Sequence, residues 1–492
     1  MTQMLVASML LAPMVAALSI QAPPLRRVAG PLALLAAIVT LVSALTIAVR
    51  VQTHGPQTAL GEWIYIDSLS VVILVLIAVV AVCATLNSIP YITHDIADGH
   101  LRHEDGPRYF SLLMVFTANM AVVPVINNLG VMWVAIEATT VVSVLLVSIY
   151  RTGQSLEAAW KYLVLGSVGI ALALFGTMMT YYASSPILGE SSDGLLWTEL
   201  RAIASQLDPD IMRLAFVFLL VGYGTKVGLA PMHTWLPDAH SQAPSPVSAL
   251  LSGVLLNCAL YAILRFRVLA AGSVGDAFTD NLLIAFGLFS AGLALPFIIV
   301  QHDIKRMLAY SSVEHMGIIA LAVGFGGPFG LYAAMLHLVA HSLTKSSLFM
   351  AAGVMVQAFN TRSMHRMSGV LSLAPFGGAI LLVGVVGLSG LPPFAMFTSE
   401  YGLIAGSFTA GHGLIGVAGL LLIALAAASL LYHIVQVAYG QPRPGKTIAA
   451  PGAATLLSIS VPLVILVVLS IAPPGDFESA LRDAATVIGG KG

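Results

Sequence analysis

Long runs of apolar residues, separated by short polar or Pro- and Gly-containing breaks, follow one another along this chain. A helix needs about 20 apolar residues to cross the hydrocarbon core of a bilayer. The pattern therefore predicts an all-α polytopic membrane protein with about fourteen spanning helices. We expect these helices near residues 4–21, 28–49, 66–89, 109–126, 129–150, 160–183, 211–231, 246–266, 281–301, 307–326, 329–357, 371–405, 413–438 and 453–472.

Composition agrees with this pattern, since 58% of the residues are hydrophobic and only 9% are charged. Soluble domains carry roughly 25% charged residues, so a soluble fold is excluded. The net charge of −1 offers no basic stripe for a nucleic acid. The two cysteines, Cys83 and Cys258, both lie in apolar runs. An iron–sulfur cluster needs about four ligands, so we expect neither a cluster nor a disulfide framework here.

The basic residues in the connections predict an orientation. Those after odd-numbered helices number eleven, and those after even-numbered helices together with the C-terminal tail number seven. Because basic connections stay in the cytoplasm, we expect the odd-numbered connections to face inward and both termini to face outward. The first set is Arg26, Arg27, Arg102, Arg108, Arg151, Lys305, Arg306, Arg362, Arg366, Arg443 and Lys446; the second is Arg50, Arg201, Arg213, Arg265, Arg267, Arg482 and Lys491.

Three lysines belong to none of these connections. Lys161, Lys226 and Lys345 lie within or at the edge of apolar runs, whereas every arginine is placed at a boundary. Burial can shift the pKa of a lysine by several units until it loses its proton, which arginine effectively cannot do. A membrane interior with lysines and without arginines indicates side chains that titrate.

Acidic residues in the apolar runs are equally rare. Glu137, Glu314 and Glu400 would each cost several kcal/mol at membrane depth, and such groups usually line ion or proton routes. The alternative is an ion pair that only locks helices together. Glu137 needs a cationic partner, and Lys226 is the obvious candidate. Gly228 and Pro231 follow Lys226 and predict a broken helix, as at the binding sites of transporters.

The predicted helix 329–357 carries His337, His341 and Lys345 at spacings of four. Residues at this spacing share one helix face, and histidine titrates near neutral pH. The stripe therefore indicates a proton relay. A metal site is the rival interpretation, but the adjacent lysine cation opposes a metal. Either histidine alone could also be an ordinary core residue.

A second break is expected at Gly390-Leu391-Pro392-Pro393, and Glu400 follows seven residues after Pro393. Asp238 likewise follows Pro231 by seven residues. This echo predicts two five-helix repeats, inverted because each holds an odd number of spans. We expect the repeats at 109–268 and 281–440, preceded by three helices in 1–108 and followed by a last helix and tail in 441–492.

At two further sites the sequence leaves more than one interpretation. Glu314 and His315 either line a route or lie at the cytoplasmic helix end and pair with Lys305 or Arg306. Lys161 could extend its amine to the membrane interface.

Three stretches resemble a known family. They are GYGTKVGLAPMHTWLPDAHSQAPSPVSALLSGVLLNCALYAILRF (222–266), QHDIKRMLAYSSVEHMGIIA (301–320) and the LPPF break (391–394). They are similar to the proton-translocating antiporter-like subunits of respiratory complex I, multi-subunit sodium/proton antiporters and membrane-bound [NiFe] hydrogenases. SVEHMG and SPVSALLSGVLLN look most like the hydrogenase-4 component F branch. The resemblance covers roughly 109–440.

The resemblance implies a fourteen-helix fold in the cell (inner) membrane, with inverted repeats and two broken helices. It also implies that Glu137 pairs with Lys226 and that charge passes along a hydrated axis, past His337, His341 and Lys345, to Glu400. One position departs from the family, because Asn257 stands where many members have a lysine. An amide carries no proton at neutral pH, so the central step would need water or Lys345 and its histidines.

In that family the partner subunits would carry the iron–sulfur clusters and possibly a NiFe centre, since this chain offers no redox site. The runner-up is a subunit of a sodium/proton antiporter or of NADH-quinone oxidoreductase. A membrane oxidoreductase with its own quinone chemistry and an inert scaffold are the remaining alternatives. Asp238, Asn257, Glu314, His315 and Lys161 are secondary candidates for the proton path.

Overall fold

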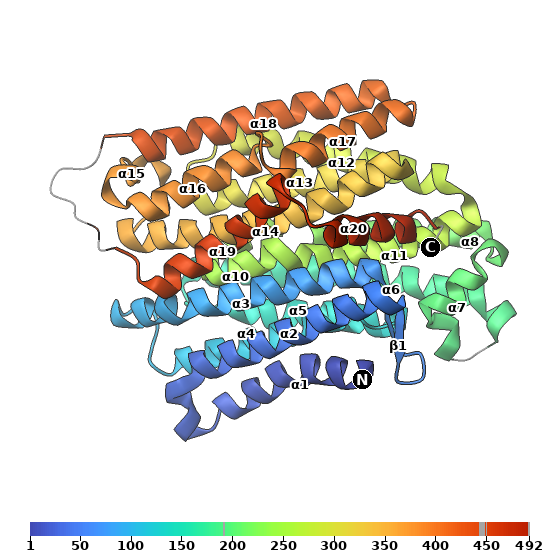
Figure 1. The fold of residues 1–492 in the computed structure, drawn as a ribbon, viewed down its shortest axis with the longest axis horizontal. Helices are drawn as coiled ribbons and strands as arrows, with labels where there is room; N and C mark the ends of the chain where they lie inside the picture. The colour runs from blue at the N-terminus through green and yellow to red at the C-terminus, as the bar shows by residue number, and fades with distance from the viewer. Residues whose placement is uncertain (190–191, 442–447, 449, 491–492) are drawn as a thin grey trace.

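The computed structural model describes residues 1–189, 192–441, 448 and 450–490. Its chain is almost entirely helical, as predicted, and the helices run roughly side by side in one bundle (Figure 1). Arg443, Lys446 and Lys491, which entered the charge count, lie outside the described residues.

Three helices form the N-terminal part of the chain: α1 (Thr2–Ile20), α2 (Ala29–His54) and α3 (Ser68–Ala97). A short 3-10 turn, η1 (Pro23–Val28), joins the first two. An antiparallel hairpin of β1 (Gln57–Ala59) and β2 (Ile64–Ile66) precedes α3. This hairpin was not predicted, because two three-residue strands leave no alternating pattern long enough to recognise.

The next two stretches of chain follow the same order of elements: two helices, one long helix, a helix broken at proline, and a closing helix. The first contains α4 (Asp105–Val122), α5 (Leu129–Val147), α6 (Gly153–Leu188), α8 (Pro209–Val227), α9 (Trp235–Gln242), α10 (Ser245–Leu250), the π-helical turn η4 (Leu251–Leu255) and α11 (Leu256–Val274). Short segments η2 (Ser192–Leu195), α7 (Trp197–Ala202) and η3 (Ala204–Gln206) connect α6 to α8.

The second stretch contains α12 (Asp276–Ile299), α13 (Ile304–Phe325), α14 (Gly327–Phe359), η5 (Met364–Arg366), α15 (Val370–Leu373), α16 (Pro375–Leu388), α17 (Ala395–Thr409) and α18 (Gly413–Tyr439). Helices α19 (Ala453–Ile471) and α20 (Gly475–Ile488) end the described chain. The tail was not expected to be helical, so α20 is an element that the apolar pattern missed. The inverted relation of the two stretches stays a prediction.

Both expected helix breaks are present. Helix α8 ends at Gly228, which adopts a left-handed conformation with φ 85°, a common way to stop a helix. The chain resumes as α9 only at Trp235. Helix α16 likewise ends before Gly390, with φ 64°, and α17 begins after Pro392 and Pro393, which cannot donate helical hydrogen bonds.

Eleven helices in the described chain are long and apolar enough to cross a bilayer. The other predicted crossings are α4, the α8–α9 pair and the α16–α17 pair, so the total of fourteen stays a prediction.

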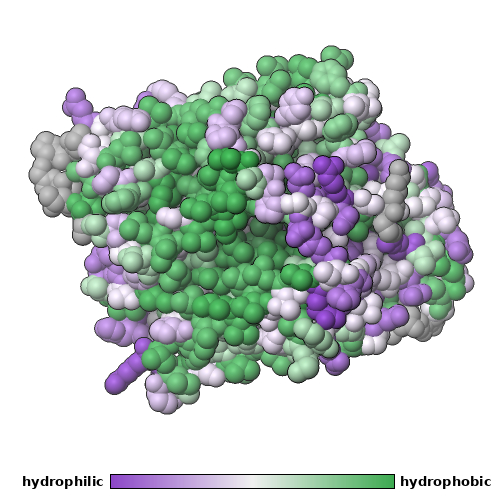
Figure 2. All heavy atoms as spheres, in the orientation of Figure 1, coloured by the Kyte–Doolittle hydropathy of each residue, from purple (hydrophilic) through white to green (hydrophobic). Residues whose placement is uncertain are grey.

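The N-terminal end of α1 and helix α20 lie at the same end of the bundle (Figure 1). Figure 2 shows apolar side chains across the middle of one face, with polar side chains gathered toward its edges.

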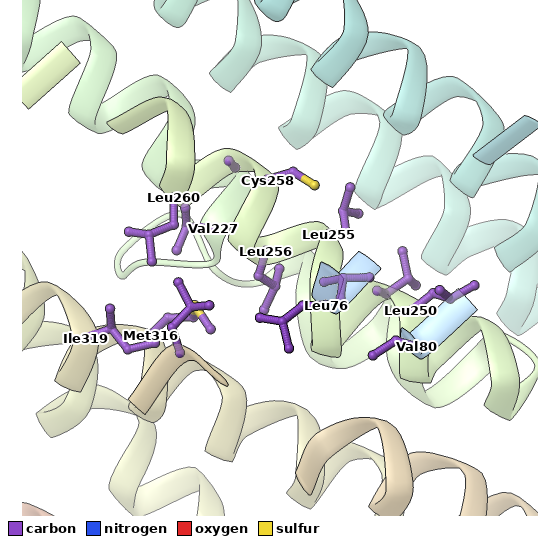
Figure 3. Packing of buried hydrophobic residues seen from close by; sticks show 14 of the residues in the cluster. Leu76, Val80, Val227, Leu250, Leu255, Leu256, Cys258, Leu260, Met316 and Ile319 are labelled. Carbon is purple, nitrogen blue, oxygen red and sulfur yellow. The ribbon is translucent and has the colours of Figure 1, made fainter. Parts of the chain in front are cut away.

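The segment α10–η4–α11 lies at the centre of the molecule, and its apolar window is completely buried. Figure 3 shows Leu256 of this segment between Leu76 of α3 and Met316 of α13, and Leu250 beside Val80 of α3. Glycines allow close approach on either side of the core. A Cβ at Gly176 of α6 would lie 2.6 Å from Leu219 of α8, and one at Gly287 of α12 would lie 2.6 Å from the Gly317 carbonyl of α13. Small residues commonly bring membrane helices together in this way.

Candidate functional site

The lysine next to the first helix break lies in a polar pocket made by three helices. Lys226 stands in the last turn of α8 and is 2% exposed. Its Nζ donates to Thr140 Oγ1 of α5 and to the Tyr162 hydroxyl of α6, both at 2.7 Å. Thr140 in turn donates to Glu137 Oε2 at 2.9 Å. A continuous hydrogen-bonded chain therefore runs from the amine to the carboxylate.

Glu137 and Lys226 do not meet directly. The ion pairs found among the described residues do not include these two groups, and the expected partners are instead joined through the Thr140 hydroxyl. The Glu137 side chain is half-buried and also accepts from Ser167 Oγ at 3.4 Å. The register of α5 brings the Thr140 hydroxyl, one turn beyond Glu137, between carboxylate and amine.

The break after Lys226 also fixes its surroundings. Trp235, the first residue of α9, stacks on Tyr162 with ring centroids 4.3 Å apart. Its indole N–H donates to the Thr225 carbonyl at 2.8 Å, which also accepts from the Gly228 N–H at the end of α8. The lysine Nζ lies 4.8 Å from the Tyr162 ring centroid. The broken helix thus builds one wall of the lysine pocket.

A second cluster lies between α13 and α14. Lys345 is fully buried, and its Nζ donates to the Leu308 carbonyl at 2.6 Å and to Ser311 Oγ. Glu314 lies one turn further along α13, 2% exposed and in electrostatic range of Lys345. Its Oε2 has no hydrogen-bond partner among the described residues. Lys345, like Lys226, therefore contacts neutral oxygen atoms.

Three histidines continue from this cluster toward α17. His315 Nδ1 shares a hydrogen bond with His337 Nε2 at 3.0 Å, and His337 Nδ1 shares one with Ser399 Oγ at 2.9 Å. The ring of His341 lies 5.5 Å from that of His315. Ser399 directly precedes Glu400, which is 8% exposed. The chain of imidazoles thus ends one residue from the Glu400 carboxyl, beside the second helix break.

The structure decides between the two interpretations of Glu314 and His315. Both are 2% exposed and lie within the bundle. Lys305 donates instead to the Ala243 carbonyl, and Arg306 pairs with Asp238 at 2.7 Å. Pairing of Glu314 or His315 with these two cations is therefore wrong, and their place is beside the lysine and histidine stripe.

Asn257 lies between the two clusters, just after the π-helical turn of the central segment. Its amide donates to the Gly253 carbonyl at 2.9 Å and to Ser342 Oγ of α14 at 2.6 Å. Ser342 directly follows His341 in α14. The neighbouring Cys258 is in electrostatic range of Lys226. Asn257 therefore ties the central segment to α14 by a hydrogen bond, through a group that does not titrate.

Lys161 and Asp238 lie away from this interior. The Lys161 side chain is 47% exposed and pairs with Glu157 at 2.7 Å and Asp238 at 3.1 Å. Asp238 also holds Arg306. The placement of Lys161 among interior lysines is corrected: its helix begins at Gly153 and carries the amine to the boundary. This network ties α6, α9 and α13 together at their ends.

Sequence reasoning missed two titratable residues. Lys305 was counted in a connection, yet it is 2% exposed in the first turn of α13. His240 of α9 is fully buried, its ring stacks on Phe349 at 4.9 Å, and neither ring nitrogen has a partner among the described residues. The polar sequence around His240 is typical of a loop. Its position directly after a helix break was the available signal.

Two arginines are also buried, which corrects their placement at boundaries. Arg265 and Arg267 of α11 are each 2% exposed. Arg265 binds both carboxylate oxygens of Asp67 at 2.7 Å, and Arg267 contacts Asp280 at 2.6 Å. Lys226, Lys305 and Lys345 make no such ion pair among the described residues. Buried arginines thus have carboxylate partners, whereas buried lysines have neutral ones.

A metal was not predicted. Within the residues that the structure describes, no group of three or more His, Cys, Asp or Glu side chains is arranged to hold a metal ion. The site is instead a series of proton donors and acceptors: a lysine–threonine–glutamate chain, a central asparagine, and a lysine, a glutamate and three histidines that lead to Glu400.

Comparison with known proteins agrees with this architecture. Residues 126–426 match the family model described as NADH:quinone oxidoreductase/Mrp antiporter, TM. A Hydrogenase-4 component F homolog of Methylacidiphilum infernorum (isolate V4) is 43% identical over 383 residues, which is 78% of this chain and 80% of that protein. NADH-quinone oxidoreductase subunit N of Desulforudis audaxviator (strain MP104C) is 30% identical over 409 residues, 82% of this chain and 78% of that protein.

Solved structures share the fold. A chain of the archaeal membrane-bound sulfane sulfur reductase superimposes with a TM-score of 0.87 at 22% identity, covering 98% of this chain and 97% of that one. A chain of respiratory complex I from Thermus thermophilus with bound Aureothin gives 0.77 at 24% identity, with 98% and 100% covered. The chain therefore belongs to the NADH:quinone oxidoreductase/Mrp antiporter family, as an antiporter-like membrane subunit of the complex I, Mrp and hydrogenase-4 group.

Proposed function

We propose that this protein translocates protons as a membrane subunit of a hydrogenase-4-type respiratory complex. Partner subunits would carry the iron–sulfur clusters and a NiFe centre, and their redox chemistry would drive proton transfer here. The 43% identity to the component F homolog across most of both chains supports this branch of the family. The predicted location is the cell (inner) membrane, with both termini on the outer side.

One observation carries the proposal: the buried lysines make hydrogen bonds only to neutral groups, and one of them is connected to a carboxylate. A neutral lysine amine has two N–H bonds, which is enough for the two acceptors of Lys226. Lysine can therefore stay buried in either charge state when its neighbours are neutral. Buried ionisable groups that satisfy this condition in a membrane are expected on proton routes.

The connection between Lys226 and Glu137 supports a specific transfer. The charged lysine gives one N–H proton to Thr140 Oγ1 while the hydroxyl proton of Thr140 passes to Glu137 Oε2. The products are a neutral amine and a carboxylic acid, and the threonine is unchanged. The reverse step restores the two charges. A change in potential made by a partner subunit would shift this balance.

The second cluster can act in the same way. Lys345 and Glu314 form a titratable pair in α13 and α14, and His341, His315 and His337 lead from them to Ser399 and Glu400. An imidazole accepts a proton at one nitrogen and releases one at the other. The hydrogen bond between His315 and His337 gives that exchange a direct contact.

The test is proton pumping by the assembled complex in sealed vesicles. Replacing Lys226 with methionine should abolish acidification, while electron transfer from donor to a soluble acceptor continues. Lys161→Met is the matched control, because it removes an exposed lysine and should leave pumping intact. Normal acidification by the Lys226 and Glu137→Gln variants would overturn the proposal.

The same preparation decides which ion and which donor are used. Proton transport that is driven by hydrogen, needs no sodium and collapses with a protonophore supports the proposal. Sodium-dependent transport would favour the multi-subunit antiporter alternative, and NADH-driven transport without hydrogenase activity would favour NADH-quinone oxidoreductase.

A further inference from the structure

Two histidines from separate connections contact each other at the surface of the protein. His302 directly precedes the start of α13, and His365 lies in η5, which follows α14. His365 Nε2 shares a hydrogen bond with His302 Nδ1 at 3.0 Å, and the ring centroids are 4.6 Å apart. Both residues are exposed, unlike the three histidines beside Lys345. The pair has no part in the proposed proton path.

Backbone hydrogen bonds hold the two connections together. The Met364 N–H donates to the His302 carbonyl at 2.8 Å, and the Ile304 N–H donates to the Arg362 carbonyl at 3.1 Å. An isolated antiparallel β-bridge lies between these two bonds. The imidazoles of His302 and His365 therefore extend from two segments whose spacing the backbone fixes, and their placement does not depend on the bond between the rings.

The distance between the two ring nitrogens is close to that of two ligands on one metal ion. A tetrahedral zinc ion with Zn–N bonds of about 2.0–2.1 Å holds its ligand nitrogens about 3.3 Å apart. Binding would thus separate the nitrogens of His302 and His365 by only about 0.3 Å from their present 3.0 Å. A neutral imidazole ligates a metal through its unprotonated nitrogen. The ring that now donates would carry its proton on its other nitrogen, so the ion displaces no proton.

The pair lines a small cavity that holds further donor atoms. The cavity has a volume of about 140 Å³, and Met364, Ser368, His433 and Gln436 also line it. His433 Nε2 donates to the Ile299 carbonyl at 3.0 Å, which leaves the lone pair of a neutral ring on Nδ1. Ligating histidines commonly donate their other N–H to a carbonyl in this way. Within the described residues no three such side chains converge on one point, so the ligand set already formed is the pair.

The arginines in the same connection as His365 are either paired or exposed to water. Arg362 pairs with Asp303 at 3.6 Å, and this carboxylate offsets its charge. Arg366 is exposed, and the high dielectric constant of water weakens its repulsion of a cation. The pair can therefore accept a positive ion.

A second histidine pair has the same nitrogen–nitrogen distance but a different environment. His315 Nδ1 and His337 Nε2 are also 3.0 Å apart, yet these residues are 2% and 1% exposed. The other ring nitrogen of His337 bonds to Ser399, and Lys345 is in electrostatic range of His315. An ion from solution would have to enter the bundle to reach this pair, whereas the exposed pair is directly accessible.

We propose that His302 and His365 bind a divalent transition-metal ion of the class that imidazole prefers, which includes zinc, copper and nickel. Water would fill the remaining positions, so the ion is exchangeable, unlike the ion of a closed structural site. The bound ion cross-links the connection that leads into α13 to the one that follows α14. The charge pattern predicts both connections on the cytoplasmic side, and the ion would come from that compartment.

Zinc titration of the full-length protein tests the proposal. The protein is purified in detergent without a polyhistidine tag and washed with a chelator, and calorimetry should then show saturable binding of one Zn²⁺ per chain. His302→Gln and His365→Gln keep a side chain that can form hydrogen bonds but lose the imidazole. Each should weaken binding roughly 100-fold, because even the loss of a group that only orients a ligand costs about 10- to 100-fold.

Two matched variants serve as controls. His103→Gln removes another exposed histidine that does not line the cavity, and it should bind zinc as the wild type does. His337→Gln breaks the buried pair and should also leave the affinity unchanged. Wild-type affinity in both His302→Gln and His365→Gln would overturn the proposal. So would an equal loss in His103→Gln, or a loss in His337→Gln with the exposed pair intact.

A spectroscopic measurement reports the ligands directly, even if a variant is less stable. One equivalent of Cu²⁺ should give an electron paramagnetic resonance spectrum with hyperfine coupling to two imidazole nitrogens in the wild type. Either glutamine variant of the pair should lose at least one of these couplings, and an unchanged spectrum in both would contradict the site. No readout here involves pumping, so failure of this site and failure of the proposed function are separate results.

Discussion

Two buried cations in the same bundle, Arg265 and Lys226, have opposite kinds of partners: a carboxylate for the first and neutral hydroxyls for the second. Arg265 is held by both carboxylate oxygens of Asp67 and lies over the rings of Trp197 and Tyr261, at 4.2 and 4.8 Å. Lys226 has only hydroxyl partners. A guanidinium is always charged, so burial requires a counterion. An amine can become neutral, so neutral partners leave both of its protonation states accessible.

The Arg265 site therefore behaves as a fixed structural pair. Burial disfavours the ionised form of Asp67, which caps α3, but Arg265 overcomes this and lowers the pKa of that carboxyl below its ordinary value. The site ties the start of α3 to the central helix α11. The Lys226 and Lys345 sites instead connect hydroxyls, imidazoles and carboxyls that can pass protons. Under the proposed function, the difference distinguishes charges that stabilise the fold from charges that move.

The largest effect is expected when the Arg265 site is disrupted. Asp67→Asn leaves the Arg265 guanidinium buried without a counterion, which should cost about 3–5 kcal/mol of stability. Thermal unfolding of the purified protein in detergent measures it. Destabilisation below about 1 kcal/mol would show that Arg265 does not depend on its carboxylate.

Lys345→Met should affect proton pumping rather than stability, the reverse of what is expected for Asp67→Asn. Because the amine has no carboxylate partner, its removal should change the free energy of unfolding by less than about 1 kcal/mol, while proton pumping is lost. The same unfolding assay, paired with vesicle acidification, checks both halves of the expectation. Strong destabilisation with residual pumping would place Lys345 with the structural charges.

The bridge between Lys226 and Glu137 sharpens the comparison further. Thr140→Val removes the hydroxyl that joins them but keeps the side-chain shape, so pumping should fall roughly 10- to 100-fold. Thr140→Ser restores the hydroxyl and should restore most of the rate. Equal activity of the valine and serine variants would show that protons bypass Thr140.

The smallest effect is expected at Lys161. Its amine is exposed to solvent and pairs with Glu157 and Asp238, and exposed pairs contribute little. Lys161→Met should therefore leave the melting temperature and the pumping rate within experimental error. A clear loss of pumping would show that Lys161 takes part in proton transfer together with the interior lysines.

Much of the helical fold follows from the sequence, because most apolar runs are long enough to cross a membrane and both helix breaks carry Gly and Pro. Helix α20 was missed because a polar 14-residue segment after a proline resembles a tail. Residues at helix ends were the hardest to place. Lys161 lies about two turns into α6 and Lys305 in the first turn of α13, and only tertiary packing decides that the first is exposed and the second buried.

The candidate site could be predicted as a set of residues but not as a path. The spacing of His337, His341 and Lys345 places them on one face, and the structure shows that this face is buried. Their partners come from other helices: Ser311 and His315 from α13, Ser399 from α17. Likewise, Thr140 lies between Glu137 and Lys226 because of how α5 packs against α8. No local pattern encodes such contacts between distant segments.

The most apolar stretch of the segment α10–η4–α11 is completely buried, and this has a consequence for biogenesis. This segment carries Arg265, Arg267 and Asn257, and each would cost several kcal/mol if it faced lipid alone. Helices α3, α12 and α14 supply the carboxylates or hydroxyl that match these groups. Entry of this segment into the lipid bilayer as a single helix is therefore unfavourable. Its stable integration depends on helices that are synthesised both before and after it.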